Sequence, residues 1–258
     1  MRDPFFFMTL DSLPQPVIFA HRGASAHAPE NTLAAFELAL AQQADAIELD
    51  VKLSADGHVV VIHDATVDRT TNGKGRVKDL SIADLKKLDA GSFFSETFAG
   101  EKIPALDEVF ETVGKRTFIN VELTNYNTPR DALVETVCML VKKHNLQKRV
   151  LFSSFFGSNL SKARSYLPDV PRGLLALNGF LGVWARSFGF VFGKYDALHP
   201  YLKDMTHQQA VRVHRLNRRI HVWTVNEEAD MRRLFNWGVD GIFTDDPELA
   251  LKVRAGAK

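Results

Sequence analysis

Cysteine is almost absent from this chain, since Cys138 is the only one in 258 residues. A single cysteine excludes an internal disulfide and any metal cluster built on several thiolates. Its neighbours, VETVCMLVKK, have the spacing of an amphipathic helix, so we expect a small buried packing residue and not a nucleophile. No P-loop and no GxGxxG loop follows a predicted strand, so no nucleotide cofactor is indicated.

Net charge is also nearly absent. The chain has 32 Lys and Arg against 31 Asp and Glu, which gives a formal net charge of +1. This balance does not indicate a nucleic-acid partner or broad electrostatic capture by an anionic membrane. With 45% hydrophobic and 24% charged residues, the composition is that of a globular protein with an ample core.

Long uninterrupted hydrophobic runs are missing as well. The N-terminal stretch MRDPFFFMTL has too short an apolar run for a signal peptide and an acidic residue before it, so we expect a cytoplasmic protein. The segment 173–193 carries a single charge, Arg186, but Gly179, Gly182 and Gly189 interrupt it. We therefore expect a buried strand followed by an apolar lid or interfacial helix, and not a transmembrane span.

Short apolar runs alternate with helical patterns along the whole chain, without a linker or a repeat of fixed period. The apolar runs cover residues 16–21, 45–51, 59–64, 116–123, 149–154, 172–177, 195–199, 219–225 and 239–245. The helical patterns cover residues 31–43, 105–115, 130–144, 158–166, 206–217, 227–237 and 246–254. This alternation predicts a parallel sheet in a single domain over residues 1–258, a length typical of one (β/α)8 barrel.

One of the nine apolar runs cannot be a parallel strand. The connection SADGH is far shorter than the crossover of about a dozen residues that parallel neighbours need. The run 59–64 must therefore return antiparallel, with Asp56-Gly57 as the turn, and a hairpin centred there pairs His63 with Asp50. The eight remaining runs predict an α/β fold of the TIM-barrel type with a β-hairpin at its second strand.

Five polar side chains are expected at one rim of this barrel. Glu48 and Asp50 are two residues apart on a strand, so they face the same side. His21, His63 and Glu122 also lie at strand ends, and in such barrels the functional groups lie at the carboxyl ends of the strands. A solvated strand face is the alternative, but it would require five polar side chains from four separate segments to converge by coincidence.

The chemistry of these side chains is that of phosphoryl transfer. The three acids form an all-oxygen ligand set that suits Mg²⁺ or Ca²⁺ and does not distinguish between the two ions. Two imidazoles, those of His21 and His63, can act as base and acid near neutral pH. Arg22 offers a planar guanidinium that fits a phosphate oxyanion.

The sequence resembles a known family over nearly its whole length, from about Val17 to Leu251. The stretches FAHRGASAHAPENTLAAFELAL, ADAIELDVKLSADGHVVVIHD, DRTTNGKGRVKDLSIADLKKLDAG and IPALDEVF closely resemble the glycerophosphodiester phosphodiesterases, and HVWTVN and GVDGIFTDDP are similar to that family's closing strands. The resemblance implies metal-dependent hydrolysis of a glycerophosphodiester to sn-glycerol 3-phosphate and an alcohol. It leaves open whether water attacks directly or a cyclic phosphate forms first.

The resemblance also assigns a cap and a set of site residues. Residues of about 65–104 would form a small cap inserted into the barrel. The side chains that the resemblance implicates are the metal ligands Glu48, Asp50 and Glu122, the catalytic acid-base pair His21 and His63, and the substrate-binding residues Arg22 and Trp223.

One position departs from the family pattern. Many relatives have a lysine two residues after the third acidic ligand, where this chain has Thr124. Such a lysine would neutralise phosphate charge, so another cation must take its place or the enzyme does without one. Lys194 and Lys203 flank the seventh strand and are the candidates that the sequence offers.

The segment 174–192 raises the question of a lipid substrate or a membrane surface. We expect it to form an apolar wall or lid that admits an acyl chain or makes transient membrane contact, so that lysophospholipids would be substrates beside soluble diesters. The alternative is a lid packed on Phe93, Phe94 and Phe98 of the cap. The sequence does not indicate an oligomeric state.

Three other functions fit the same fold. The first is a lysophospholipase D-like enzyme or another phosphodiester hydrolase, which only substrate profiling would distinguish. The second is a barrel that binds phosphodiesters without turnover, although the intact His21 and His63 argue against it. The third is a sugar-phosphate isomerase, which would leave the two carboxylates at 48 and 50 without a role.

Overall fold

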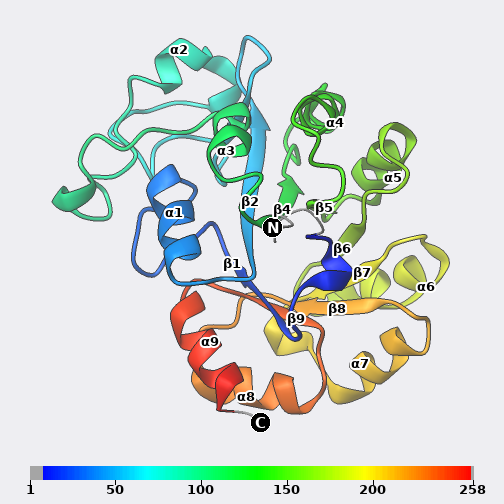
Figure 1. Ribbon diagram of the computed structural model, residues 1–258. Helices are drawn as coiled ribbons and strands as arrows, with labels where there is room; N and C mark the ends of the chain where they lie inside the picture. The colour runs from blue at the N-terminus through cyan, green and yellow to red at the C-terminus, as the bar shows by residue number, and fades with distance from the viewer. Residues whose placement is uncertain (1–7, 257–258) are drawn as a thin grey trace, which may run out of the picture.

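The sheet of this protein closes into a barrel. The computed structural model describes residues 8–256. Its strands are β1 (Val17–Ala20), β2 (Ala46–Leu53), β3 (Val59–Val61), β4 (Phe118–Leu123), β5 (Val150–Ser154), β6 (Arg172–Ala176), β7 (Ala197–Pro200), β8 (Arg219–Val222) and β9 (Gly241–Thr244). The nine strands follow the order β1-β9-β8-β7-β6-β5-β4-β2-β3, and β1 also pairs with β2 (Figure 1). Because β3 lies outside the ring, eight parallel strands close it, and the predicted TIM-type barrel is confirmed.

Helices connect the strands on the outside of the barrel. They are α1 (Leu33–Ala41), α2 (Ile82–Leu85), α3 (Leu106–Thr112), α4 (Leu133–Lys143), α5 (Gly157–Tyr166), α6 (Phe190–Phe192), α7 (His207–His214), α8 (Glu228–Asn236) and α9 (Pro247–Ala255). Several begin at a side-chain cap, as at Thr32, whose hydroxyl accepts a hydrogen bond from the Ala35 amide. Within residues 8–256, no helix combines the length and hydropathy needed to cross a bilayer. Residues 1–7, most of the stretch considered as a signal peptide, lie outside the described residues.

Two apolar layers result from the alternation of side chains along the strands. Residues of one face, such as Ile47, Leu49 and Val51 of β2, pack against the surrounding helices together with Cys138 of α4. Residues of the other face fill the lower barrel interior, where the short helix η1 (Leu10–Ser12) closes the end. The members of this inner cluster are Leu10, Leu13, Val17, Phe19, Ala46, Phe118, Leu151 and Phe243. Cys138 is buried, as predicted. Glu48 and Asp50 share the strand face opposite these outward residues, which also agrees with the prediction.

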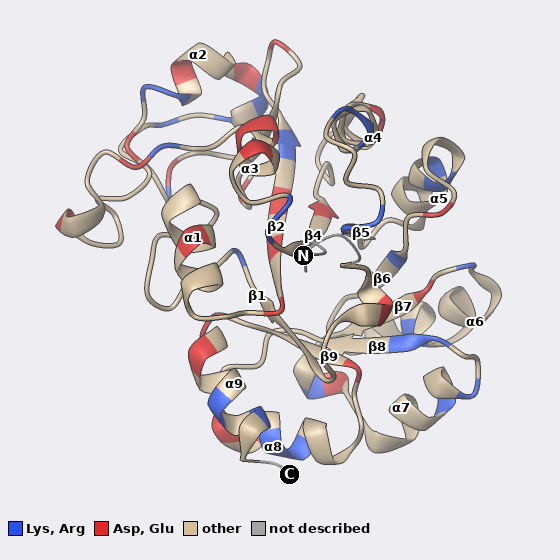
Figure 2. Cartoon of the chain, viewed as in Figure 1, with Lys and Arg blue, Asp and Glu red and all other residues tan. Residues whose placement is uncertain are grey.

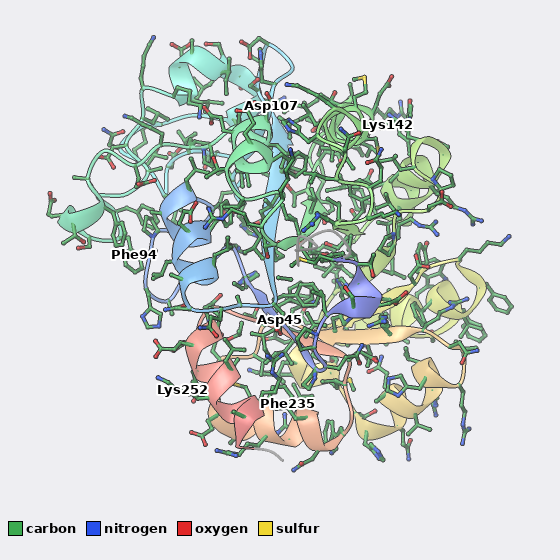
Figure 3. The ribbon with its side chains drawn as sticks, viewed as in Figure 1. Asp45, Phe94, Asp107, Lys142, Phe235 and Lys252 are labelled. Carbon is green, nitrogen blue, oxygen red and sulfur yellow. The ribbon has the colours of Figure 1, made fainter. Side chains whose placement is uncertain are left out.

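The N-terminal end of the barrel is also tied together by charge. Asp45, labelled in Figure 3, accepts a hydrogen bond of 2.8 Å from the Ile18 amide of β1 and forms an ion pair with Arg254 of α9. Arg254 donates a further hydrogen bond to the Pro16 carbonyl, at 2.9 Å. This pair links the first and last elements of the fold at the start of β2.

The predicted hairpin forms, but its predicted register was wrong by one residue. Val51 pairs with Val61 and Leu53 with Val59, and the Ile62 amide bonds to the Asp50 carbonyl, so Ile62 and not His63 lies opposite Asp50. The reason is a three-residue loop closed by the bond from the Ser54 amide to the His58 carbonyl. Gly57 closes this loop with a φ of +82°, a conformation that glycine adopts without strain.

The segment 65–104 folds over the rim as a cap. It contains η2 (Val77–Asp79), α2 and η3 (Glu96–Phe98) and has a small apolar cluster of its own. This cluster is shared with Val60 and Ile62 of the hairpin, and its other members are Val67, Val77, Leu85, Ala90 and Ile103. The cap therefore rests on the β2–β3 hairpin that also carries His63.

The apolar segment after β6 forms a lid on another side of the rim. It comprises η4 (Gly179–Gly182), a π-helical turn (Ala185–Gly189) and α6. In Figure 1 the lid lies at the right and the cap at the upper left, so the lid does not pack on the cap phenylalanines. Within the lid only Phe190 among the phenylalanines is buried, beneath the guanidinium of Arg218.

Candidate active site

Three carboxylates lie on neighbouring strands inside the mouth of the barrel. Glu48 and Asp50 lie on β2, and Asp50 pairs in register with Glu122 of β4, as the acidic segments of these strands show in Figure 2. One carboxylate oxygen from each residue lies within 4.8 Å of the other two. Glu48 and Asp50 are almost completely buried. The structure thus brings the three predicted metal ligands together.

The electrostatics of this group oppose the ionisation of all three carboxyl groups at once. Burial and the charges of Asp50 and Glu122 raise the pKa of Glu48 well above its usual value. Burial and Asp50 likewise raise the pKa of Glu122 to about 8. Burial also opposes ionisation of Asp50, but the charges of Arg22 and the two histidines and the hydrogen bond from Asn31 together outweigh it and lower the pKa of that carboxyl. Buried carboxylates that repel each other in this way are a suitable environment for a cation.

Arg22 connects this acidic group to the rim. Its backbone amide donates to Glu48 at 2.8 Å, and its guanidinium lies 3.3 Å from Asp50 and 2.9 Å from Glu30. Glu30 in turn accepts two hydrogen bonds from Arg69 of the cap. The guanidinium of Arg22 is therefore fixed between carboxylates, and it also lines the cavity described below.

His21 is oriented by a carboxylate from the last strand of the barrel. Its Nδ1 lies 2.6 Å from Asp245, which follows β9. Burial would raise the pKa of Asp245, but the bonds from His21, Asn226 and Ser25 lower it to about 2. An ionised Asp245 accepts the Nδ1 proton of His21, and Nε2 is then the nitrogen available to a substrate.

His63 has the same arrangement on the opposite flank. Its Nδ1 lies 2.7 Å from Asp64, and Arg69 holds Asp64 with a hydrogen bond of 2.7 Å. His63 is exposed, whereas His21 is half-buried. Each of the two predicted catalytic histidines thus has one ring nitrogen bound to a carboxylate and the other free.

These groups surround a small cavity of about 60 Å³ whose other wall is apolar. That wall consists of Phe155, Leu175 and Trp223. Trp223 is fixed by a hydrogen bond of 2.8 Å from its indole N–H to the His199 carbonyl, and its ring meets Phe155 edge to face. Below them His199 and His221 form a buried pair, and burial lowers the pKa of His199 to about 3, so both rings are neutral.

The comparison with known families agrees with this geometry. The family model described as the glycerophosphoryl diester phosphodiesterase family matches residues 21–249. The chain belongs to this family.

Individual relatives match over nearly the whole chain. A glycerophosphodiester phosphodiesterase of Caldanaerobacter subterraneus subsp. tengcongensis is 42% identical over 242 residues, which cover 93% of this chain and 98% of the relative. One of Bacillus subtilis is 36% identical, with 92% and 86% covered. The structure of an Oleispira antarctica phosphodiesterase in complex with the product sn-glycerol-3-phosphate has a TM-score of 0.86 and 31% identity, with 96% and 100% covered. The predicted family and the prediction of an enzyme are confirmed.

A lysine from the neighbouring strand lies at Thr124, the position that departs from the pattern expected from the sequence. Lys52 of β2 reaches across to β4, where its Nζ donates to the hydroxyl and the carbonyl of Thr124, each at 2.9 Å. Like the sequence candidates Lys194 and Lys203, Lys52 does not line the cavity between the histidines, but of the three it is the one whose ammonium binds Thr124. Burial lowers the pKa of Lys52, against the attraction of Asp50 and Glu122.

Three residues that contact this group of side chains or Thr124 beside it were not predicted from the sequence. Lys52 lies on the strand that carries Glu48 and Asp50, so the same two-residue alternation could have found it. Tyr126 donates a hydrogen bond of 2.8 Å to Glu122, and its hydroxyl accepts from the Phe155 amide. Asp245 lies in the quoted segment GVDGIFTDDP, and its place at a strand end was the available signal.

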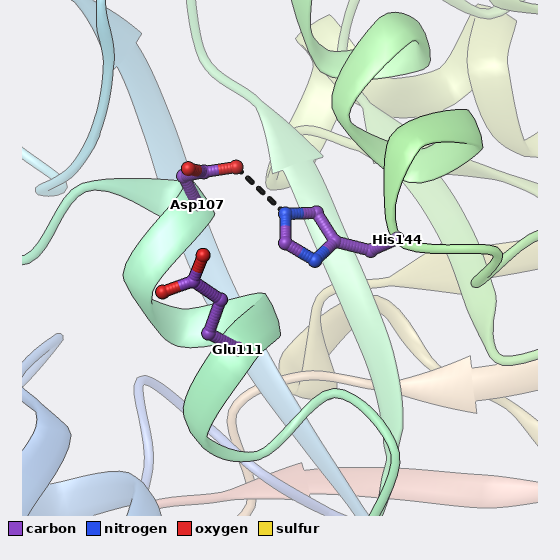
Figure 4. A group of neighbouring side chains, drawn as sticks. All are labelled: Asp107, Glu111 and His144. Carbon is purple, nitrogen blue, oxygen red and sulfur yellow. Dashed lines mark hydrogen bonds and ion pairs between the residues drawn. The ribbon is translucent and has the colours of Figure 1, made fainter.

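A second acidic group lies outside the barrel and is not a comparable site. Asp107, Glu111 and His144 lie between α3 and the end of α4, as Figure 4 shows. Asp107 already binds the His144 ring at 2.6 Å and the Lys143 ammonium at 2.7 Å. These contacts give Asp107 a cation from the protein itself, so the group joins two helices.

Proposed function

We propose that this enzyme hydrolyses glycerophosphodiesters to sn-glycerol 3-phosphate and an alcohol, with a divalent metal ion and the acid-base pair His21 and His63. The observation that carries the proposal is the cluster of three carboxylates, two buried and one half-buried, beside two histidines that are each bound to a carboxylate. No other arrangement of the described residues supplies both a cation site and a paired acid and base at one cavity.

The donor set fits a hard divalent cation. Glu48 has an oxygen, Oε1, that is buried and has no hydrogen-bond partner among the described residues, while its other oxygen binds the Arg22 amide. Asp50 and Glu122 are fixed by Asn31 and Tyr126, at 2.9 Å and 2.8 Å. Such a cation, when bound, supplies positive charge to a phosphate oxygen as a Lewis acid. Carboxylate donors alone do not choose between Mg²⁺ and Ca²⁺.

The protein side chains divide the remaining work of the reaction. Arg22 holds a second phosphate oxygen, because its guanidinium is fixed by Glu30 and Asp50 at the edge of the cavity. One of the two histidines takes a proton from the attacking hydroxyl, and the other gives a proton to the leaving alkoxide. Asp245 and Asp64 keep each ring in the orientation and protonation state that these transfers need.

Removal of divalent metal ions is the first test. We expect EDTA to lower the release of sn-glycerol 3-phosphate from glycerophosphocholine by roughly 10²–10⁴-fold, because the buried carboxylates then face the phosphate without a cation. Rates after addition of Mg²⁺ or Ca²⁺ identify the ion. Asp107→Asn, which disrupts the other acidic group, is the matched control and should keep the full metal response. Full turnover in EDTA would reject the proposed metal.

A lysophospholipid at a lipid surface is a second candidate substrate, favoured by the lid. Phe180, Phe188 and Phe192 have exposed fractions of 90%, 67% and 79%, and Figure 2 shows α6 to be free of charged residues. The lid follows β6, so it lies at the carboxyl end of the barrel, where the site is. The neighbouring hollow of about 420 Å³ is lined by Phe188 and Phe192 and also by Arg186 and Arg212. Exposed aromatic rings beside arginines fit the surface of an anionic bilayer.

Co-sedimentation with vesicles tests this surface. We expect the double variant Phe188→Asp/Phe192→Asp to bind vesicles of phosphatidylcholine and phosphatidylglycerol roughly 10²-fold more weakly, since burial of each ring contributes about 1.5–3 kcal/mol. Phe190 is unsuitable for this test because it is buried. Phe93→Asp/Phe94→Asp on the cap is the matched control, and unfolding temperatures verify that both variants fold. Unchanged binding of the lid variant would count against lipid contact.

A further inference from the structure

Another cavity, of about 380 Å³, lies between the cap and the rim of the barrel, and it is larger than the cavity between the two histidines. The cap side is formed by Ala65, Thr66 and the chain from Arg76 to Lys78. The barrel side is formed by Lys52 and by the loop that follows β4, including Thr124 and Asn125. No residue of this cavity belongs to the cavity that contains the two histidines.

The lining of this cavity is cationic. It includes Lys52, Arg76 and Lys78, and none of the described residues that line it is acidic. Arg76 and Lys78 form no ion pair with any residue between positions 8 and 256. The nearest carboxylate of the loop, Asp131, is occupied by hydrogen bonds from Asn125 and Thr128, at 2.7 Å each. Three cations without a carboxylate partner favour an anionic ligand.

Both walls are built rigidly. In the cap, Thr66 and Arg76 form an antiparallel bridge, and the Val77 amide bonds to the Ala65 carbonyl at 3.0 Å. In the barrel, the Lys52 ammonium is fixed on Thr124 by two hydrogen bonds. A ligand therefore meets the Lys52 charge already in place, while the exposed side chains of Arg76 and Lys78 extend from a backbone that is fixed.

The strand register relates this cavity to the reacting centre. Lys52 and Thr124 each follow a predicted metal ligand, Asp50 and Glu122, by two residues on the same strand face. At about 3.3 Å per residue they lie roughly 7 Å further toward the mouth. A short alcohol attached to the phosphate can span a distance of this size. The opposite wall of the reacting centre is the apolar one of Phe155 and Trp223, which suits carbon and not charge.

We propose that this cavity is a subsite for a second anionic group, a phosphate or a carboxylate, on the leaving alcohol of the substrate. The proposal rests on the proposed phosphodiesterase function and deepens it by naming a substrate class. Glycerophosphodiesters with an acidic alcohol are then preferred over those with a neutral or cationic alcohol, such as choline. The preference arises at Lys52, Arg76 and Lys78, on the cap side of the phosphate.

Two diesters that differ in one anionic group test the subsite. The probes are glycerophosphoethanolamine and glycerophosphoserine, which differ by one carboxylate on the leaving alcohol, and sn-glycerol 3-phosphate release is measured directly for each. We expect kcat/KM to be about tenfold higher for the serine diester, and the ratio to approach one in Arg76→Ala/Lys78→Ala. Lys74→Ala, a cap lysine that does not line the cavity, should keep the wild-type ratio.

A binding measurement separates failure of this subsite from failure of the proposed reaction. Crystals of the enzyme soaked in selenate should show an anomalous peak within hydrogen-bond distance of Lys52, Arg76 or Lys78, and the double variant should lack it. If neither diester is hydrolysed, the proposed function fails and the selenate peak alone decides on the subsite. A wild-type ratio near one, a ratio retained in the double variant, or a cavity without selenate would each overturn the subsite.

Discussion

His21→Ala and His63→Ala should each lower kcat for glycerophosphocholine by roughly 10²–10⁴-fold, the range typical of a lost general acid or base. Both rings have Nδ1 bound to a carboxylate, so each has one nitrogen left for proton transfer. His144 is the matched control, because its ring is also bound to a carboxylate, Asp107, but lies between two outer helices. His144→Ala should keep kcat within about twofold of the wild-type value, since this ring packs against Phe110 between the outer helices and does not line the cavity between the two catalytic histidines.

A change of leaving group then assigns the two roles. An acidic alcohol such as p-nitrophenol departs without protonation, so the variant that lacks the general acid should recover most of its rate on glycerophospho-p-nitrophenol. The variant that lacks the general base should remain slow on both diesters. If both histidine variants keep more than about a tenth of the wild-type kcat, the acid-base pair is wrong and another group must move the protons.

Local patterns predicted the parts of this site that depend on strand geometry. The two-residue alternation put Glu48 and Asp50 on one face, and the rule that function lies at carboxyl strand ends brought in His21 and Glu122. The same rule would have put Asp245 at this rim, but its contact with His21 could not be predicted, because 224 positions separate the two residues and only closure of the barrel brings them together. The hairpin register failed because the loop has three residues and ends at Gly57 with a positive φ, which the sequence SADGH does not specify.

The contact of a lysine with Thr124 shows the same limit more clearly. Both candidates from the sequence, Lys194 and Lys203, flank a strand end, and that position alone indicated them. The observed cation, Lys52, comes from the neighbouring strand and reaches Thr124 sideways across the sheet. The two-residue alternation along β2 puts Lys52 on the same face as Asp50, and the pairing of β2 with β4 then brings it beside Thr124.

Glu122→Gln should affect stability and activity in opposite directions. In the metal-free enzyme, burial and Asp50 raise the pKa of Glu122 from 4.5 to about 8. The folded state thus binds this proton more tightly than the unfolded state, so its contribution to stability is fully present below pH 4.5 and is lost as the pH rises through about 8. A glutamine has no proton to lose over this pH range, so the variant does not lose stability in this way, and its amide oxygen can still accept the hydrogen bond from the Tyr126 hydroxyl. At pH 8 in EDTA, we expect the variant to be more stable by a few kcal/mol, or several degrees in Tm.

The same substitution removes one of the three anions that would hold the cation. We therefore expect kcat to fall by roughly 10² or more, and the rise in Tm that Mg²⁺ or Ca²⁺ produces in the wild type to shrink. Glu111→Gln, an exposed acid of the outer cluster, should change neither property. Calorimetry of the wild type and both variants at pH 5 and pH 8, with and without metal, measures Tm under each of these four conditions. A variant that is less stable than the wild type at pH 8 in EDTA would mean that Glu122 is held by stabilising contacts, and that the site does not require a cation to offset its charge.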